Sequence, residues 1–449
     1  MNKKISYGIG ALGKDMVYAL VSGFILYYYN TILGISGTFT GIMMMLARVF
    51  DAFNDPIMGV VVEKTNTKFG KFRPWIFSGT IINALILYGM FAMPESLSGT
   101  AMLIYASLAY VLWGVSYTMM DIPFWSMIPA LTKPGKERED LTVVGRTSAS
   151  IGFAIPTAIT MLLVTHLGSS ERQGFAYLAA GIALVFILFE TICILGIKEK
   201  PTKADKTPSL KEMLQSLVSN DQAMLVVLAI ILFNSSIYLT SQLALYFFKY
   251  DIGNSEIFGL FGIIGGAGQM LSMMTYPILR KRWSTRQVLI GGIGVTIFGY
   301  LLLFLLASLH QTSIIFLGLS AFIIYIGFGL VTVLTTIFLA DTVDYGEWKT
   351  GQRNESVVFS MQTFVVKLAS AISVLISGIG IDLIGLDVKA AQQSPETLFG
   401  LRALMTIVPI IGFVVSLCYF TKKYKLTEAE TKRIAQELAT RRGAEVAHD

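Results

Sequence analysis

The sequence predicts an all-α integral membrane protein, with twelve transmembrane helices in two six-helix bundles and both termini in the cytoplasm. Three observations support this fold class: the apolar composition, the number of long apolar runs and the distribution of basic residues. Of the 449 residues, 54% are hydrophobic and 14% are charged, whereas about 25% of residues are charged in soluble domains. The mean hydropathy is +0.65. This composition excludes a soluble globular enzyme and a disordered chain.

The apolar runs set the number of spans. A bilayer-spanning helix needs about 20 mostly apolar residues, and twelve segments of the chain meet that requirement. They cover residues 8–33, 37–62, 74–94, 101–127, 142–166, 174–197, 222–249, 256–278, 287–307, 313–340, 355–385 and 396–420. The first segment contains Lys14 and Asp15 and has no small-residue cleavage site, so we expect a mature helix and not a signal peptide.

The basic residues of the loops set the orientation. Lys and Arg concentrate in the connections that follow even-numbered spans and are scarce in the others. Because cytoplasmic loops carry the excess of basic residues, both termini are expected in the cytoplasm. The net charge of +6 is explained by these loops and does not indicate nucleic-acid binding.

The longest polar connection divides the chain into parts. Residues 198–221 are expected to form a cytoplasmic middle loop between an N-terminal bundle, 1–197, and a C-terminal bundle, 222–420. This six-plus-six arrangement is typical of a large class of secondary transporters. Residues 421–449 form a charged cytoplasmic tail, in which Leu426, Ile434 and Leu438 indicate one amphipathic helix.

Cysteine and histidine usage argues against a metal centre. The two cysteines, Cys193 and Cys418, lie in distant apolar runs, and the three histidines are also far apart. Neither a disulfide framework nor a thiolate or histidine metal site is expected from this spacing. We therefore expect no cofactor.

Charges inside the predicted spans are the most informative residues. Each costs at least ~2.5–3.5 kcal/mol near the bilayer centre, so it should face a cavity or a partner. We single out eight such residues: Lys14, Asp15, Arg48, Asp51, Asp55, Asp121, Arg146 and Lys367. Seven of them lie in the first half of the chain, which indicates that this half carries most of the binding chemistry.

The second span predicts a cation site. Asp51 and Asp55 are spaced i,i+4, so both carboxylates lie on one helix face, and Asn54 adds an amide oxygen. Such hard oxygen ligands suit a small monovalent cation, or a proton shared between two acids. In the alternative interpretation Arg48 neutralises Asp51 and the cluster only packs the helix, but one base cannot neutralise two acids.

The fourth span predicts a sugar site. Tyr117, Asp121 and Trp125 follow one another at intervals of four residues, so they share a face. A carboxylate beside an aromatic ring is suited to sugars, because the acid accepts hydroxyl hydrogen bonds and the ring packs on apolar C–H groups. Thr118 can add a hydroxyl to the cation site. The alternative for Trp125 alone is a residue of the interfacial aromatic belt.

Two further basic residues have open roles. Arg146 offers a planar fork of donors for Asp15, Asp121 or vicinal sugar hydroxyls, or it extends from a helix end to the interface. Lys367 either faces the first-half acids across a central cavity or lies near the end of its helix.

The same residues carry a family resemblance. The matching stretches are 7–15, 47–59, 70–75, 113–125, 340–347 and 362–367. Through them the chain resembles the glycoside–pentoside–hexuronide:cation symporter family, and within it the melibiose permeases. The stretches run from the first predicted span to the eleventh, so the resemblance covers nearly the whole chain.

The resemblance implies a major facilitator fold, alternating access and particular site residues. It implies a cation site formed by Asp51, Asn54, Asp55 and Thr118. In this implied site Na+ is held by Asp51 and Asp55. It implies a sugar site at Lys14, Asp15, Tyr117, Asp121, Trp125, Arg146, Thr363 and Lys367. It also implies cytoplasmic gate pairs among Arg48, Asp341, Asp344, Glu347, Arg353 and Glu355. The presence of both acids and Asn54 favours sodium, or lithium, over a carrier limited to protons.

Two positions depart from the melibiose permeases. Ser22 stands where they have a tyrosine, and Thr332 where they have a tryptophan. Both changes widen the sugar pocket or alter its stacking, so the identity of the sugar stays open.

We therefore expect a multi-pass cell-membrane symporter, and not an enzyme, that carries a glycoside together with a monovalent cation. A galactoside such as melibiose is the first expectation; the alternatives are another glycoside, a pentoside or a hexuronide, or a lysolipid. A membrane-embedded enzyme or sensor is a third class, but no nucleophile elbow, phosphate loop or His metal motif supports it. No nucleic-acid partner is expected, and no oligomer is required.

Overall fold

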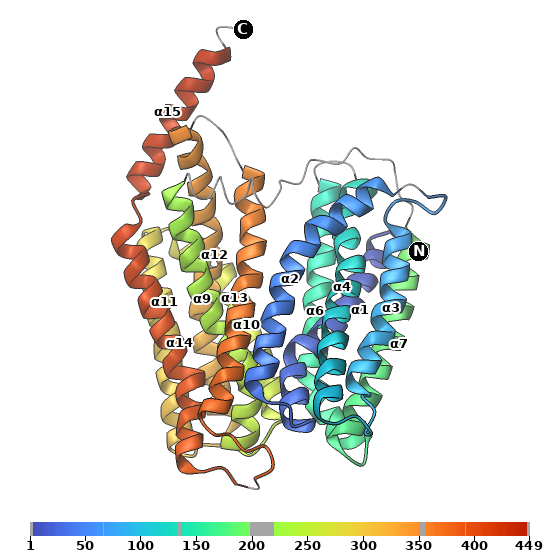
Figure 1. The fold of residues 1–449 in the computed structure, drawn as a ribbon. Helices are drawn as coiled ribbons and strands as arrows, with labels where there is room; N and C mark the ends of the chain where they lie inside the picture. Colours follow the sequence, from blue (N-terminus) through green and yellow to red (C-terminus); the bar gives the residue numbers. More distant parts are fainter. Residues whose placement is uncertain are drawn as a thin grey trace. The chain divides into compact units, whose positions relative to one another are not determined.

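The structure is a computed structural model that describes residues 3–65, 67–132, 136–197, 220–350, 355–390 and 392–446. Nearly all of this part of the chain is helical (Figure 1). The elements of the first half are α1 (Lys3–Tyr27), the π-helical turn η1 (Tyr28–Ile32), α2 (Gly37–Lys64), α3 (Arg73–Phe91), α4 (Gly99–Ser126), α5 (Ile128–Leu131), α6 (Lys136–Leu167) and α7 (Glu171–Gly196). Those of the second half are α9 (Asp221–Tyr246), the π-helical turn η2 (Phe247–Asp251), α10 (Ile257–Leu279), α11 (Thr285–Ser308), α12 (Ile314–Thr350), α13 (Glu355–Leu383), α14 (Pro395–Lys423) and α15 (Glu428–Val446).

Most of the long helices have the composition of membrane spans. Within the described residues, eleven helices are long and apolar enough to cross a membrane. The predicted all-helical membrane class is therefore confirmed. The span of 37–62 forms α2 but is not among the eleven; Arg48, Asp51 and Asp55 lie on it. The total of twelve spans and the cytoplasmic position of the termini stay predictions.

The chain divides into two compact units. The first comprises residues 1–206, 254–262 and 374–394, and the second comprises 207–253, 263–373 and 395–449. The predicted bundle boundaries, 1–197 and 222–420, stay predictions. Most of the predicted middle loop, 198–219, lies outside the described residues.

In the first unit, α1 is packed most extensively. It lies against α6 and α7, while α3 lies against α4 and α7, and α2 against α4 (Figure 1). Glycine permits the close approach of α1 and α6, because a Cβ at Gly152 would lie 2.2 Å from the backbone oxygen of Leu12. Small residues at helix contacts allow such backbone-to-backbone packing in lipid. This packing brings side chains of α1, α4 and α6 together.

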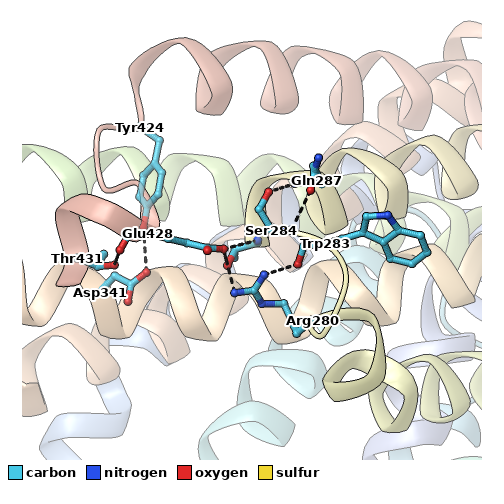
Figure 2. Close-up of polar contacts among 9 residues, drawn as sticks. Arg280, Trp283, Ser284, Gln287, Asp341, Tyr424, Glu428 and Thr431 are labelled. Atoms are coloured by element: carbon cyan, nitrogen blue, oxygen red, sulfur yellow. Dashed lines mark hydrogen bonds and ion pairs between the residues drawn. The ribbon is translucent and has the colours of Figure 1, made fainter.

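In the second unit, α11 packs on α12 and α14, and α9 packs on α12 and α14. Polar residues start several helices by accepting backbone N–H groups. Asn220 Oδ1 accepts the N–H of Ala223 at 2.9 Å in α9. Ser284 and Gln287 form a reciprocal capping box at α11 (Figure 2), an arrangement that satisfies two N–H groups left free at a helix start.

The charged tail folds onto the second unit. Leu426, Ile434 and Leu438, the apolar residues that indicate an amphipathic helix, form one buried cluster with Tyr345 and Trp348 of α12. Polar contacts add to this packing. Glu428 Oε1 forms an ion pair with Arg280 Nη2 at 2.9 Å, and it also accepts the N–H of Thr285 at 2.8 Å (Figure 2). The tail is therefore docked on the ends of α10, α11 and α12.

Candidate functional site

Lys14 of α1 lies at the centre of the candidate site in the first unit. Its side chain is 3% exposed, and its Nζ forms ion pairs with Asp15 Oδ2 at 2.8 Å and Asp121 Oδ1 at 2.7 Å. The two carboxylates are more accessible, at 18% and 25%. A buried ammonium needs such partners, because an isolated charge in an apolar interior is strongly disfavoured. Lys14 thus joins α1 to α4, and the carboxylates keep some exposure.

Trp125 forms the aromatic side of this cluster. Its Nε1–H donates to Asp121 Oδ1 at 3.1 Å, one helical turn earlier on α4. The guanidinium carbon of Arg146, on α6, lies 4.2 Å from the centroid of the Trp125 ring, and Lys14 Nζ lies 4.8 Å from it. Cations attract the face of an indole ring. Three helices therefore bring together five predicted sugar-site residues: Lys14, Asp15, Asp121, Trp125 and Arg146.

This arrangement offers three kinds of recognition within a small volume. Asp15 and Asp121 supply acceptors, Lys14 and Arg146 supply donors, and Trp125 supplies a flat apolar ring. A few polar groups beside an aromatic surface are typical of small-molecule sites. The group is suited to a neutral polyhydroxylated ligand.

Tyr117 belongs to an adjoining stack of rings. It lies 5.4 Å from Trp113 and 5.5 Å from Tyr18, measured between ring centroids. The Arg48 guanidinium carbon lies 5.6 Å from the centroid of Tyr18, and Arg48 Nη1 donates to the Tyr18 hydroxyl at 3.4 Å. Arg48, predicted as a gate residue, is thus buried against an aromatic ring within the first unit.

Two of the predicted cation ligands of α2, Asp51 and Asp55, face α4. The Thr118 hydroxyl donates to Asp55 Oδ1 at 3.2 Å. Asp51 lies against Gly114, where a Cβ would come within 2.8 Å of Asp51 Oδ1. Asn54 lies between the two acids in sequence and is partly buried. Asp55 is therefore in direct contact with Thr118, and Asp51 lies beside Gly114, one turn earlier on α4. Both carboxylates thus approach the same helix.

The donor set of this group is limited to oxygen. Among the described residues, no cluster of three or more His, Cys, Asp or Glu side chains is arranged to hold a metal ion. The group instead combines two carboxylates with the neutral oxygens of Asn54 and Thr118. Such hard oxygen ligands do not suit soft metals, which prefer thiolate or imidazole; that a monovalent cation binds here stays a prediction.

The other predicted gate residues belong to the second half. Asp341, on α12, accepts a hydrogen bond from the Tyr424 hydroxyl at 3.3 Å (Figure 2). Asp344 and Glu347 are partly buried on the same helix. Arg353 and the side chain of Glu355 lie outside the described residues. Their pairing into gates stays a prediction.

Two predicted sugar-site residues lie on α13. Lys367 is partly buried in the second unit, and the side chain of Thr363 lies outside the described residues. Their part in a sugar site also stays a prediction.

One buried acid lies outside the eight charged residues that the sequence singles out in the spans. Glu190, on α7, is 0% exposed and lies within the predicted span 174–197. The sequence signal was present, because Glu190 is a carboxylic acid in an otherwise apolar run from 175 to 197. Glu190 has no second charged residue within the span, and helical spacing alone does not connect it with Lys14 of α1 or Asp121 of α4.

Comparison with known proteins assigns the chain to a class and then to a family. The model of the MFS/sugar transport protein family matches residues 6–428. The chain is 28% identical to the uncharacterized symporter YjmB of Bacillus subtilis, covering 98% of this chain and 95% of the relative. It is 28% identical to an isoprimeverose transporter of Lactiplantibacillus pentosus, covering 97% and 90%. It is 26% identical to a putative 2,3-dihydroxypropane-1-sulfonate exporter of Escherichia coli, covering 98% and 96%.

A solved structure supports the fold. A bacterial homologue of the human lysosomal transporter Spinster matches with a TM-score of 0.72 and 12% identity, over 95% of this chain and 97% of the other. The family match and the symporter and transporter relatives show that the protein is a multi-pass membrane transporter of the cell membrane, and not an enzyme. More particularly, it belongs to the MFS/sugar transport protein family.

Proposed function

We propose that this transporter is a cation-coupled sugar symporter. The coupling ion is Na+, with Li+ or a proton as alternatives, and the substrate is a glycoside, first of all a galactoside such as melibiose. The observation that carries the proposal is that α4 bears both candidate sites. Thr118 contacts Asp55 at 3.2 Å, and less than one turn further Asp121 contacts Lys14 at 2.7 Å.

The sugar would be held by side chains that give up part of their present contacts with one another and bind the sugar instead. Asp15 and Asp121 accept sugar hydroxyls, and Arg146 donates to vicinal oxygens. Trp125 packs on the C–H face of the ring, as aromatic residues do with apolar surfaces. Since Arg146 lies over the Trp125 ring at 4.2 Å, we expect its guanidinium to shift to the sugar hydroxyls when the pyranose stacks.

The cation would act through α4. An ion between Asp51 and Asp55, completed by Asn54 and Thr118, offsets the repulsion of two carboxylates on one helix face. It also fixes the Thr118 segment, which lies beside Asp121. Because coupling between two binding sites is reciprocal, the sugar then favours the ion as much as the ion favours the sugar. Transport follows by alternating access.

The substrate class has one alternative group: another glycoside, a pentoside or a hexuronide. The isoprimeverose transporter among the relatives supports a sugar other than a galactoside. The putative 2,3-dihydroxypropane-1-sulfonate exporter among the relatives would favour an acidic substrate instead. In this chain Lys14 is already paired with Asp15 and Asp121, which favours a neutral sugar over an acidic one.

The proposed transport cycle requires few partners. No cofactor, nucleic acid or oligomer is needed for this cycle; the partners are the sugar, the cation and the lipid bilayer.

Calorimetric binding of a galactoside panel to purified protein, with and without Na+, tests the proposal. Binding of one α-galactoside that Na+ strengthens supports both the sugar class and the coupling. If no galactoside binds under either condition, the same titration is repeated with pentosides and hexuronides. Failure of every sugar to bind contradicts the proposal.

A further inference from the structure

Glu190 is a buried acid that the proposed sugar and cation sites do not use. It lies on α7 in the first unit and is 0% exposed. Among the described residues, neither Oε1 nor Oε2 has a hydrogen-bond partner. A carboxylate without partners in an apolar interior is strongly disfavoured, whereas the neutral acid is tolerated. Glu190 is therefore a buried carboxyl group that no hydrogen-bond donor of the described residues stabilises as a carboxylate.

The packing around Glu190 is tight. Cys193 of α7 lies so close to α1 that a Cβ added at Gly10 would be 2.8 Å from the Cβ of Cys193. A Cβ added at Gly13 would likewise be 2.8 Å from the Cβ of Phe189. These two contacts place the face of α7 around Glu190 directly on α1. Little room is left for water to solvate a carboxylate.

The charged and titratable groups around Glu190 come from three helices. They are Tyr7, Lys14 and Asp15 of α1, Tyr117 and Asp121 of α4, and Cys193 of α7 itself. Lys14 is the base that would neutralise an ionised Glu190. Its Nζ, however, is already committed to Asp15 at 2.8 Å and to Asp121 at 2.7 Å. An ionised Glu190 would therefore have to compete with Asp15 and Asp121 for the same ammonium.

We propose that Glu190 is a proton-binding site of this transporter, and that its proton keeps Lys14 paired with Asp15 and Asp121. When Glu190 carries the proton it is neutral, and the cluster around Lys14 is undisturbed. When the proton leaves to solvent, the remaining carboxylate attracts Lys14 and weakens both existing ion pairs. The proton on Glu190 and the geometry of the candidate sugar site are thereby linked.

Infrared spectroscopy of the full-length protein in lipid tests the proton site directly. At pH 7 an ordinary glutamate is ionised, so a protonated Glu190 gives a carboxylic-acid carbonyl band that other glutamates do not. We expect this band in the wild type, its loss in Glu190→Gln and its return in Glu190→Asp. The matched control is Glu171→Gln on the same helix, whose carboxylate accepts the Tyr27 hydroxyl at 2.6 Å outside the cluster; it should keep the band. An identical pH 7 spectrum for wild type and Glu190→Gln overturns the proposal.

The link to sugar binding rests on the function proposed above and is tested separately. With Na+ constant, the sugar affinity of the wild type should fall about tenfold over the pH range in which Glu190 loses its proton, and by reciprocity bound sugar should tighten proton binding to Glu190 by the same factor. Glu190→Gln should bind sugar with an affinity that is flat over that range, and Glu171→Gln should follow the wild type. A Glu190→Gln variant with the wild-type pH dependence overturns the coupling. If the infrared band is present but no sugar binds at any pH, the proton site stands and the proposed function fails.

Discussion

Replacement of Asp121 by asparagine isolates the charge of one carboxylate in the candidate sugar site. Asp121 Oδ1 accepts from Trp125 Nε1 at 3.1 Å and pairs with Lys14 Nζ at 2.7 Å. In Asp121→Asn the amide oxygen can still accept from Trp125, so the ring stays in place. Lys14 also keeps Asp15 at 2.8 Å, so the variant is expected to fold. What is lost is a charged acceptor that is 25% exposed and open to a ligand.

The expected effect follows from the strength of hydrogen bonds to charged groups. Such a bond contributes about 1.5–3 kcal/mol, so the loss of one bond to a sugar hydroxyl weakens binding about 10- to 150-fold. Calorimetric titration of the sugar at saturating Na+ measures this change. Thermal unfolding of the same sample verifies that the variant is folded.

The matched control is Asp140→Asn in the same unit. Asp140 pairs with Lys4 at 2.8 Å, and the two side chains are 41% and 39% exposed, a setting in which an ion pair contributes little. Its sugar affinity should equal that of the wild type. A folded Asp121→Asn protein that also binds sugar as the wild type does would refute the placement of Asp121 in the sugar site.

Three further predictions concern the cation, the sugar pocket and the tail. Asp51→Cys or Asp55→Cys should abolish stimulation of sugar binding by Na+, since each removes one of two anionic ligands; stimulation that survives contradicts the cation site. Thr332→Trp should shift the preference among disaccharides, and an unaltered uptake spectrum places that residue outside the pocket. The pKa of the Glu428 carboxyl is held below its ordinary value of about 4.3, chiefly by the backbone N–H of Thr285. Its stabilisation of tail docking is therefore complete above that ordinary value and lost as the pH falls through the lower folded value. Glu428→Gln should weaken the contact at neutral pH, seen as faster proteolysis of the tail.

A control for the tail is Glu430→Gln. Glu430 pairs with Arg433 within α15 itself, so its loss should not change docking. Equal proteolysis rates for wild type and Glu428→Gln, at neutral and acidic pH, would show that Glu428 does not hold the tail.

Local spacing predicted the parts of the site that lie on single helices. The four-residue interval between Asp121 and Trp125 predicted a shared face, and the two residues are hydrogen-bonded at 3.1 Å. The same interval placed Asp51 and Asp55 together, and both approach α4. These contacts follow from helical periodicity, which sequence alone supplies.

Contacts between helices were not predictable in the same way. The ion pair of Lys14 with Asp121 joins α1 to α4 at 2.7 Å, whereas helical periodicity relates only residues of one helix. The isolation of Glu190 is likewise a product of packing, because it depends on the approach of α7 to α1. The contact of Asp341 with Tyr424 joins residues 83 positions apart, and no periodic pattern indicates it.

In the proposed cycle, a cation gradient drives sugar across the membrane. The most direct measurement is uptake of a radiolabelled galactoside into proteoliposomes that contain the purified protein, with and without an inward Na+ gradient. We predict that the unchanged sugar accumulates above its external concentration only when the gradient is imposed, and that Asp55→Cys abolishes this accumulation. Sugar that equilibrates at the same rate and to the same level with and without the gradient would contradict the account.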